Sequence, residues 1–159
     1  MRLKSHTNLL KCLPAIVFLA LISGCTLSGG GNASFDNVKG EKIVQTARTV
    51  TGTPYCWGGT SPAQGFDCSG YVFWVYKQHG YNLPRTAAEQ ARAGTSISKG
   101  NLRAGDIVVF NPSWGKHTGI YTGRKTFLHS PKSGSRVKEE SLDTPYWSRV
   151  FAGGRRIIR

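Results

Sequence analysis

A single cysteine stands where a polar segment gives way to an apolar one, in the stretch GFDCSGYVFW. Asp67 is a good N-cap residue, and the apolar run starts directly after it, which places Cys68 at the first position of a helix. Unpaired backbone N–H groups and the positive end of the helix dipole stabilise a thiolate at such a position. The position therefore favours a nucleophile over a buried structural cysteine or one half of a disulfide.

A cysteine nucleophile needs a base within hydrogen-bond reach, and three histidines follow it. His79 ends the helix that Cys68 begins and lies about 16 Å away at 1.5 Å per residue. It is better interpreted as a C-terminal helix residue that interacts with the helix dipole. His117 opens HTGIYTG, and His129 lies in FLHS on the next predicted strand. A three-residue turn at 123–125 makes these two diagonal neighbours on one face, whereas a two-residue turn separates them. The first register predicts a relay in which His129 orients His117 and His117 accepts the thiol proton.

The elements that position these residues fall into two groups. Apolar spacing predicts helices at Glu41–Val50, Cys68–His79 and Thr86–Ala93, the second being the most buried. From Asp106 onward, short runs of β-forming residues predict strands, at Ile107–Phe110, Thr118–Thr122 and Thr126–Ser130, with further strands near Val137, Val150–Phe151 and Ile157–Ile158. Helices followed by an antiparallel sheet predict an α+β domain.

The first residues have the features of an export signal. A basic leader precedes the ten-residue apolar run Leu13–Ile22, which is too short to span a bilayer and is typical of a signal peptide. The adjoining ISGC, which ends at Cys25, resembles the lipobox of bacterial lipoproteins. We therefore expect residues 1–24 to be a signal peptide, Cys25 to be acylated (palmitate-type) and residues 25–39 to form a flexible tether to a domain at 40–159. The alternative is an ordinary secretory signal with a chance cysteine.

Localisation and partners follow from these expectations. Thr26 stands where an Asp favours inner-membrane retention in enteric-type lipoproteins, so we expect anchoring in the outer membrane of a Gram-negative-type bacterium, facing the periplasm. The chain carries a net charge of +13; without the three basic leader residues, 18 basic residues face 8 acidic ones, a net charge of +10. Anionic cell-wall polymer and lipid head groups are the expected partners, and nucleic acid is not. We expect a monomer with no metal and no cofactor.

An ordered series of motifs resembles the NlpC/P60 cysteine peptidases of bacterial cell walls. The motifs, which extend over about residues 52–130, are TPYCWGG (53–59), DCSG (67–70), PRT with Gln90, AGDIVVF (104–110), HTGIY (117–121) and His129-Ser130. Each motif is modest by itself, whereas the ordered set is specific. Ala104 stands in place of the family's usual Pro, and Thr118 in place of its usual Val.

The resemblance implies a papain-like α+β fold with Cys68 as nucleophile, His117 as base and His129 as third residue. It also implies that Tyr55 lines the site and assists the oxyanion or the substrate. Ser69 and Arg85 are weaker candidates for substrate binding, since Ser69 is equally well explained as a helix N-terminal residue and Arg85 as an exposed structural residue. The family's usual substrate is the peptidoglycan stem peptide, most often at the γ-D-glutamyl–diaminopimelate amide.

One further cysteine bears on whether the site is active. Cys56 and Cys68 are the thiols left after lipidation, since Cys12 lies in the leader, and a disulfide between them would silence the enzyme in an oxidising compartment. Alternation next to Tyr55 turns Cys56 away from the site, which predicts two free thiols. Two other functions remain open: a lipid-anchored wall-binding module with silenced chemistry, and an amidase or transacylase reaction on the same fold.

Overall fold

A six-stranded antiparallel sheet forms the centre of the computed structural model, which describes residues 31–158 and their side chains from residue 36 onward. Its strand order is β3-β8-β4-β5-β6-β7, and a two-stranded ribbon, β1-β2, lies apart from it. The strands are β1 (Thr60–Ser61), β2 (Gly65–Phe66), β3 (Thr95–Ile97), β4 (Ile107–Phe110), β5 (His117–Tyr121), β6 (Thr126–His129), β7 (Lys138–Ser141) and β8 (Phe151–Arg156). The helices are α1 (Gly31–Thr49), α2 (Cys68–Lys77), α3 (Ala87–Gln90) and α4 (Pro145–Val150), with a 3₁₀ turn at Lys99–Asn101.

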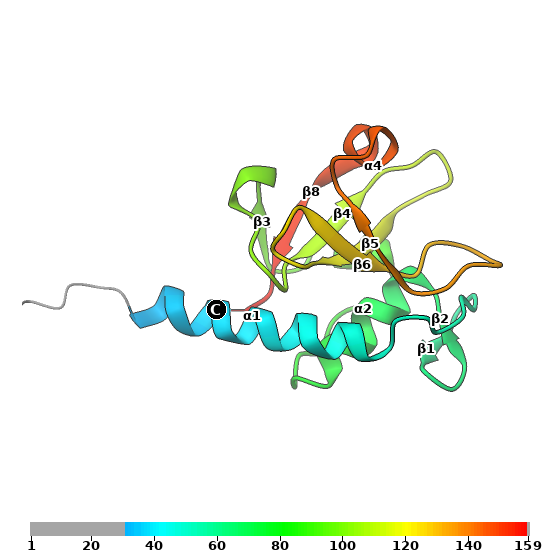
Figure 1. Ribbon diagram of the computed structural model, residues 1–159, viewed down its shortest axis with the longest axis horizontal. Helices are drawn as coiled ribbons and strands as arrows, with labels where there is room; N and C mark the ends of the chain where they lie inside the picture. The colour runs from blue at the N-terminus through cyan, green and yellow to red at the C-terminus, as the bar shows by residue number, and fades with distance from the viewer. Residues whose placement is uncertain (1–30, 159) are drawn as a thin grey trace, which may run out of the picture.

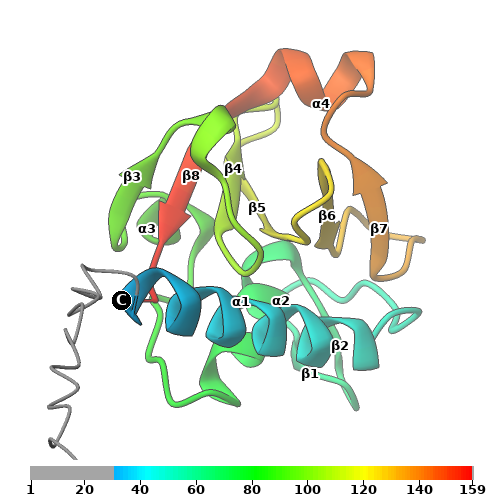
Figure 2. The ribbon, with the colours of Figure 1, turned by 60° about the vertical axis from the view of Figure 1, so that its left-hand side comes forward.

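The sheet is covered on both faces, and this divides the core in two. Helices α1 and α2 lie along one side of the sheet, and α4 lies at its other side (Figures 1 and 2). One apolar cluster joins α1 and α2 to alternate sheet residues such as Ile107, Val109 and Ile120. The second joins Val108 and Phe110 on the opposite face of the sheet to Trp147 of α4 and others. The described domain is therefore α+β, with helices packed on an antiparallel sheet as predicted.

Helix α1 uses the apolar stripe that the sequence predicts, but it starts earlier. The stripe residues Ile43, Val44 and Ala47 are buried against the core. The helix begins at Gly31, ten residues before the predicted start, so that residues 31–39 of the predicted tether are helical. Adding a turn to an existing helix costs far less than nucleating one, and no proline interrupts this segment. The prediction relied on the glycine-rich composition of this segment and therefore placed the start of the helix too late.

Helix α2 follows the prediction closely at its N-terminus. Asp67 is the N-cap, and its side chain accepts a hydrogen bond from the Gly70 N–H at 2.7 Å. Four aromatic and β-branched residues on one side of the helix are fully buried: Tyr71, Val72, Val75 and Tyr76. The helix ends at Lys77, two residues before His79, whose ring lies 2.8 Å from Thr46 Oγ1, away from the site. Cys68 is thus held at the first turn of a buried, well-anchored helix.

The three central strands lie where they were predicted, and the outer elements differ. Strand β3 and helix α4 were not predicted, and residues 157–158 are not a strand. Strand β7 follows Val137, and β8 begins at Phe151. Thr144 caps α4 and Pro145 occupies its first turn, a helix-start signal present in the sequence. The missed elements are short and hold few apolar residues of their own, so local periodicity is weak there.

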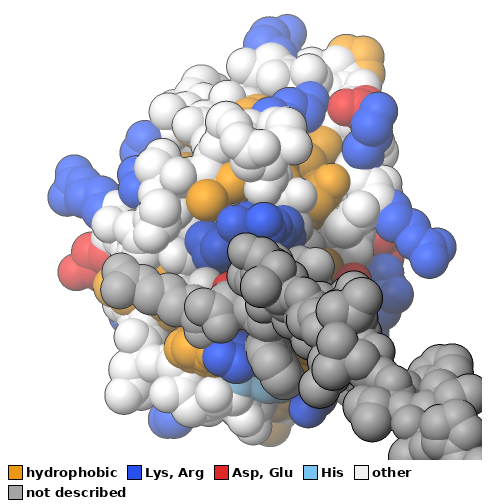
Figure 3. Space-filling view, turned by 90° about the vertical axis from the view of Figure 1, so that its left-hand side faces the viewer, with side chains coloured by type: hydrophobic (Ala, Val, Ile, Leu, Met, Phe, Trp, Pro, Cys, Tyr) orange, Lys and Arg blue, Asp and Glu red, His pale blue; other side chains and the backbone are white. Residues whose placement is uncertain are grey.

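Several expectations concern residues outside the described part of the chain. The signal peptide and Cys25 lie there, so their predicted roles stay predictions. Within the described residues, no helix combines the length and apolarity that a membrane span requires. Lys and Arg side chains occur over several parts of the face shown in Figure 3, where Asp and Glu are few, in line with the net charge of +13.

Candidate active site

The Cys68 thiol sits at the N-terminus of α2, beside the start of β5. The backbone of Thr118, the residue after His117, hydrogen-bonds the sulfur. Burial raises the pKa of the Cys68 thiol above its ordinary value and the charge of Asp67 adds to this, while backbone hydrogen bonds from Thr118, Ser69 and Cys68 itself oppose it. The helix position is as predicted, but the expected stabilised thiolate is not found, because loss of solvation outweighs the helix N-terminal effect.

The two sheet histidines meet as the three-residue turn predicts. Thr122 and Thr126 pair across 123–125, with the Thr122 N–H donating to the Thr126 carbonyl at 3.0 Å, and Ile120 lies opposite Leu128. His117 Nε2 and His129 Nδ1 are 2.8 Å apart, and both side chains are fully buried. The diagonal geometry on one face is therefore confirmed.

Burial also sets the charge of the imidazole pair. Loss of solvation lowers the pKa of His117 well below its ordinary value, and the neighbouring His129 lowers it further. The pKa of His129 is lowered by burial as well. Both directions favour a neutral imidazole and a protonated thiol in the free site, so attack of this thiol on a carbonyl would require transfer of its proton from sulfur to nitrogen.

Glycine 119 makes the close approach of the two rings feasible. It lies in β5 two residues after His117, and a Cβ there would be 2.8 Å from the Leu128 carbonyl oxygen and 3.1 Å from the Cβ of His129. A side chain at this position would push β6 and His129 away. The role of Gly119 in bringing the imidazoles together was not predicted.

An ion pair holds the cap of the nucleophile helix. Arg85 Nη2 lies 2.6 Å from Asp67 Oδ2, and its Nη1 is 3.0 Å from both Asp67 Oδ1 and Ser69 Oγ. Partial burial tends to raise the pKa of Asp67, but the contacts with Arg85 and the Gly70 N–H outweigh this effect and lower the pKa below its ordinary value. Arg85 and Ser69 both line the pocket, but their polar atoms are directed at Asp67 and at each other. Their contact with substrate stays a prediction, whereas their support of the Asp67 cap is seen directly.

Two further expectations concern the loop before β1. Tyr55 lines the pocket, and burial raises the pKa of its phenol, with the charges of Cys68 and Asp67 adding, so it remains a hydrogen-bond donor. At Gly70 in α2, a Cβ would lie 2.0 Å from the Gly59 carbonyl oxygen, so the small size of this residue lets the loop before β1 pack against the helix. Cys56 is free, as predicted, and so is Cys68.

The buried side chain of Gln90 links helix α2, which carries Cys68, to strand β5, which carries His117. Gln90 Nε2 donates to the Ser69 carbonyl at 2.9 Å and to the Pro84 carbonyl at 3.0 Å. Its Oε1 accepts from Thr118 Oγ1 at 2.9 Å. Gln90 appeared in the sequence only as part of a motif, without a role. The structure shows it fixing the distance between the elements that carry Cys68 and His117.

Helix α4 and strand β7 supply two neighbours of the imidazoles that sequence reasoning missed. The Trp147 ring stacks on His117 with centroids 5.4 Å apart and planes 23° apart, and meets His129 edge-on. The Trp147 indole N–H donates to Glu140, whose Oε2 is 3.2 Å from His129 Nε2. For Trp147 the sequence held the Thr144–Pro145 helix-start signal, and for Glu140 it held the alternation of KEES in β7, which identifies a partner only when the strand register is known.

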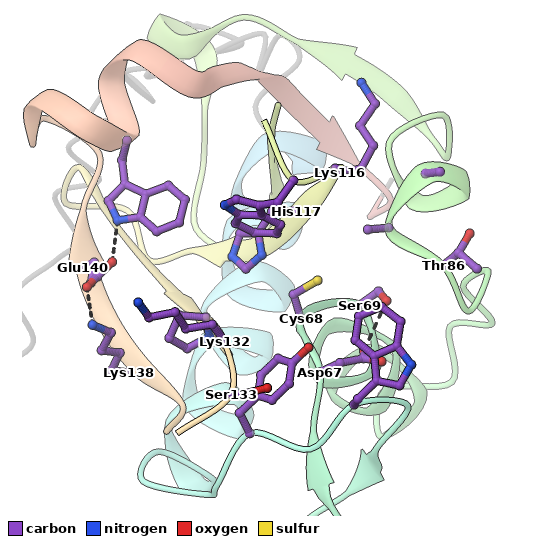
Figure 4. Close-up of a pocket in the computed structure, with 18 of the residues that line it drawn as sticks. Asp67, Cys68, Ser69, Thr86, Lys116, His117, Lys132, Ser133, Lys138 and Glu140 are labelled. Atoms are coloured by element: carbon purple, nitrogen blue, oxygen red, sulfur yellow. Dashed lines mark hydrogen bonds and ion pairs between the residues drawn. The ribbon is translucent and has the colours of Figure 1, made fainter. Parts of the chain in front are cut away.

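An open pocket of about 1390 Å³ lies over this cluster, and His117, Glu140 and Trp147 line it, with His129 buried behind them (Figure 4). Cys68 and His117 both line it. Lys116, Lys132 and Lys138 supply positive charge on its walls, and the exposed rings of Trp57, Trp114 and Tyr146 also line it. Together the thiol, the buried imidazole pair and the open pocket provide the groups that acyl transfer with a cysteine nucleophile requires.

Comparisons with known proteins agree with a cysteine-based site of this kind. The model of the NlpC/P60 family matches residues 52–156, and the chain belongs to this family. A probable endopeptidase of Corynebacterium glutamicum is 46% identical over 112 residues, covering 70% of this chain and 53% of the relative. The γ-D-glutamyl-L-lysine dipeptidyl-peptidase of Bacillus subtilis is 38% identical, covering 73% and 40%. This chain spans about half the length of these curated relatives, or less.

Solved structures show the same fold. An NlpC/P60 family protein from Bacillus cereus superimposes with a TM-score of 0.71 at 34% identity, covering 76% of this chain and 40% of that one. The NlpC/p60 domain of the peptidoglycan hydrolase SagA gives a TM-score of 0.66 at 34% identity, covering 74% of this chain and 98% of that one. The expected papain-like NlpC/P60 fold is thereby confirmed.

Proposed function

We propose that the protein is a peptidoglycan hydrolase, a cysteine endopeptidase that cleaves the stem peptide at the γ-D-glutamyl–diaminopimelate amide. The observation that carries this proposal is that Cys68 and His117 line one open pocket, with His117 buried and paired with His129 behind it. Relatives named murein DD-endopeptidase in Escherichia coli and γ-D-glutamyl-L-lysine dipeptidyl-peptidase in Bacillus subtilis support the substrate class.

The geometry supports a two-step reaction. His117 takes the proton of Cys68 as the sulfur attacks the amide carbonyl carbon, and the resulting oxyanion accepts hydrogen bonds from Tyr55 and from the first N–H groups of α2. His117 then gives its proton to the departing amine, which leaves a thioester. Water attacks the thioester with His117 as base, releasing the acid and restoring the thiol. His129 orients His117 throughout.

Charge in the pocket supports an anionic substrate. The carboxylates of Asp67 and Glu140 are already paired with Arg85 and Lys138. Lys116 and Lys132 line the same walls, so the net charge offered to a ligand is positive. Stem peptides carry free carboxylates at glutamate, diaminopimelate and the C-terminus, and these groups suit such walls.

Digestion of purified sacculi with mass analysis of the products tests the proposal. We expect fragments that end at D-glutamate and begin at diaminopimelate, none with Cys68→Ala, and wild-type amounts with the matched control Cys56→Ala. Products that carry a new amine in place of the acid would instead identify a transacylase. Wall binding with no product from the reduced wild-type protein would identify a binding module. Substantial cleavage by Cys68→Ala would disprove the nucleophile assignment.

We also propose that Cys25 is lipidated and anchors the protein in the outer membrane, facing the periplasm, as a monomer. The ISGC sequence after a ten-residue apolar run supports the lipidation, and Thr26 in place of an Asp supports the outer membrane. Metabolic labelling with an alkyne fatty acid, followed by membrane fractionation, tests it. We expect label in the full-length wild type and none in Cys25→Ala, with Cys12→Ala as the control. Label that persists in Cys25→Ala would rule the site out.

A further inference from the structure

A carboxylate lies behind the imidazole pair on the edge strand of the sheet. The register of β6 and β7 pairs His129 with Lys138 and Phe127 with Glu140, so Glu140 is a diagonal neighbour of His129 on the same face. His129 Nε2 lies 3.2 Å from Glu140 Oε2. The two groups are at ion-pair distance, although in the free protein the N–H is not well aligned with the oxygen. Hydrogen bonds in unliganded sites are often loose in this way.

Two other groups hold Glu140 in place and ionised. The Trp147 indole of α4 donates to Oε2, and the Lys138 ammonium is 2.5 Å from Oε1. The His129 ring, Lys138 and Trp147 together lower the pKa of Glu140 to about 2, against the effect of its partial burial. In the described part of the chain, the titratable and charged groups that face this carboxylate are His129 from β6, Lys138 from β7 itself and, one ring further, His117 from β5.

The carboxylate decides which nitrogen of each imidazole carries the proton. A neutral imidazole has one N–H and one lone pair, whereas a carboxylate only accepts. With Glu140 behind it, His129 carries its proton on Nε2, and its Nδ1 accepts from the His117 Nε2–H at 2.8 Å. His117 Nδ1 is then left with a lone pair. This atom is buried and has no hydrogen-bond partner among the described residues, as a proton acceptor for the thiol requires.

We propose that Glu140 is a positioning residue, whose carboxylate fixes the tautomers of His129 and His117 so that the free nitrogen of His117 serves the Cys68 thiol. The inference rests on the proposed function, since it concerns the same base. When His117 takes the thiol proton, the imidazolium is stabilised through His129 by the negative charge, and Glu140 stays ionised throughout. The opposite tautomers would place a proton on His117 Nδ1 and block the transfer.

Glu140→Gln tests the tautomers directly, because an amide both accepts and donates and no longer selects one form. Glu139→Gln is the matched control, since Glu139 faces the other way and pairs with Arg48 at 3.3 Å. Imidazole ¹⁵N NMR reports which nitrogen is protonated and needs no substrate. We expect protons on Nε2 of both rings in the wild type and in Glu139→Gln, and mixed tautomers in Glu140→Gln. Wild-type tautomers in a folded Glu140→Gln would overturn the proposal.

Kinetics on stem peptides give the second readout. We expect Glu140→Gln to lower kcat by at least about tenfold with little change in KM, and to move the acidic limb of the pH profile to lower pH, because the carboxylate raises the pKa of both imidazoles. Glu140→Asp keeps the negative charge, so the acidic limb of its pH profile should stay at the wild-type pH. If Glu140→Gln does not fold, the pH profile of Glu140→Asp provides the test. A loss confined to KM would indicate a substrate contact and refute the assignment. A wild type that cleaves no stem peptide, with tautomers that still respond to Glu140→Gln, would reject only the proposed function.

Discussion

Burial sets the resting protonation state of Cys68 and His117. The sequence placed both residues and the parity of His117 and His129 correctly, because a helix cap and a hairpin turn are local patterns. It overestimated thiolate stability, because solvation depends on what packs over the site and cannot be read from neighbours in the chain. Trp147 and Glu140 were missed for the same reason, since they reach the imidazoles from elements formed later in the sequence.

The raised pKa of the Cys68 thiol predicts the pH dependence of its alkylation. A raised pKa keeps the reactive thiolate scarce at pH values where an ordinary thiol has already ionised, so the midpoint of the rate profile lies at higher pH. Iodoacetamide labelling of the Cys56→Ser protein, followed by mass spectrometry from pH 5 upward, measures it against N-acetylcysteine amide. A midpoint below that of the model thiol would contradict the expectation.

At the scale of the elements, two contacts align the parts of the fold that carry Cys68, His117 and His129. One is the close approach of strands β5 and β6 at Gly119, and the other is the set of hydrogen bonds made by the Gln90 side chain between α2 and β5. The β4–β6 strands and the face of α2 were predictable from period-2 and helical spacing. The contacts of Gly119 and Gln90 were not predictable, because a glycine in a strand and a glutamine in a short helix have no sequence pattern that reveals their partners.

Gly119→Ala should reduce both stability and activity. The added methyl meets the Leu128 carbonyl at 2.8 Å and the His129 Cβ at 3.1 Å, so β6 must shift, at a cost of about 1–3 kcal/mol. Urea unfolding and stem-peptide hydrolysis measure the two effects. Gly100→Ala is the control, since a Cβ there meets nothing within 4 Å. Equal behaviour of the two variants would show that the close approach is unimportant.

Gln90→Leu should lower stability by about 1–3 kcal/mol for each buried partner left unsatisfied, and reduce kcat. The partners are the carbonyls of Ser69 and Pro84 and the hydroxyl of Thr118, and the Ser69 and Thr118 groups lie on the two sides of the site. Thermal unfolding and hydrolysis rates provide the measurement. Gln78→Leu, at an exposed position that bonds only the Trp74 carbonyl, is the matched control. A wild-type kcat in Gln90→Leu would mean that the link does not align the pair.

At the scale of the whole molecule, the positive net charge and the basic pocket walls both favour an anionic substrate. The chain carries +13, and lysines line the walls near His117. We expect kcat/KM on sacculi to fall steeply as salt rises from about 0.05 to 0.5 M, because screening weakens attraction to an anionic polymer. Alkylation of Cys68 by uncharged iodoacetamide is the internal control and should not change. A salt-independent kcat/KM would show that charge does not guide the encounter.

The length of α1 has a consequence for where the enzyme can work. The helix runs from Gly31 to Thr49, a rod of about 28 Å, and its far end leads through a short loop to Tyr55 in the pocket. If Cys25 is acylated as we propose, the lipid attachment point precedes in sequence the end of this rod that is remote from Tyr55. Under that proposal the rod would act as a spacer between the bilayer and the Cys68 thiol, and removing whole turns from its first part would draw the zone of digestible wall toward the membrane.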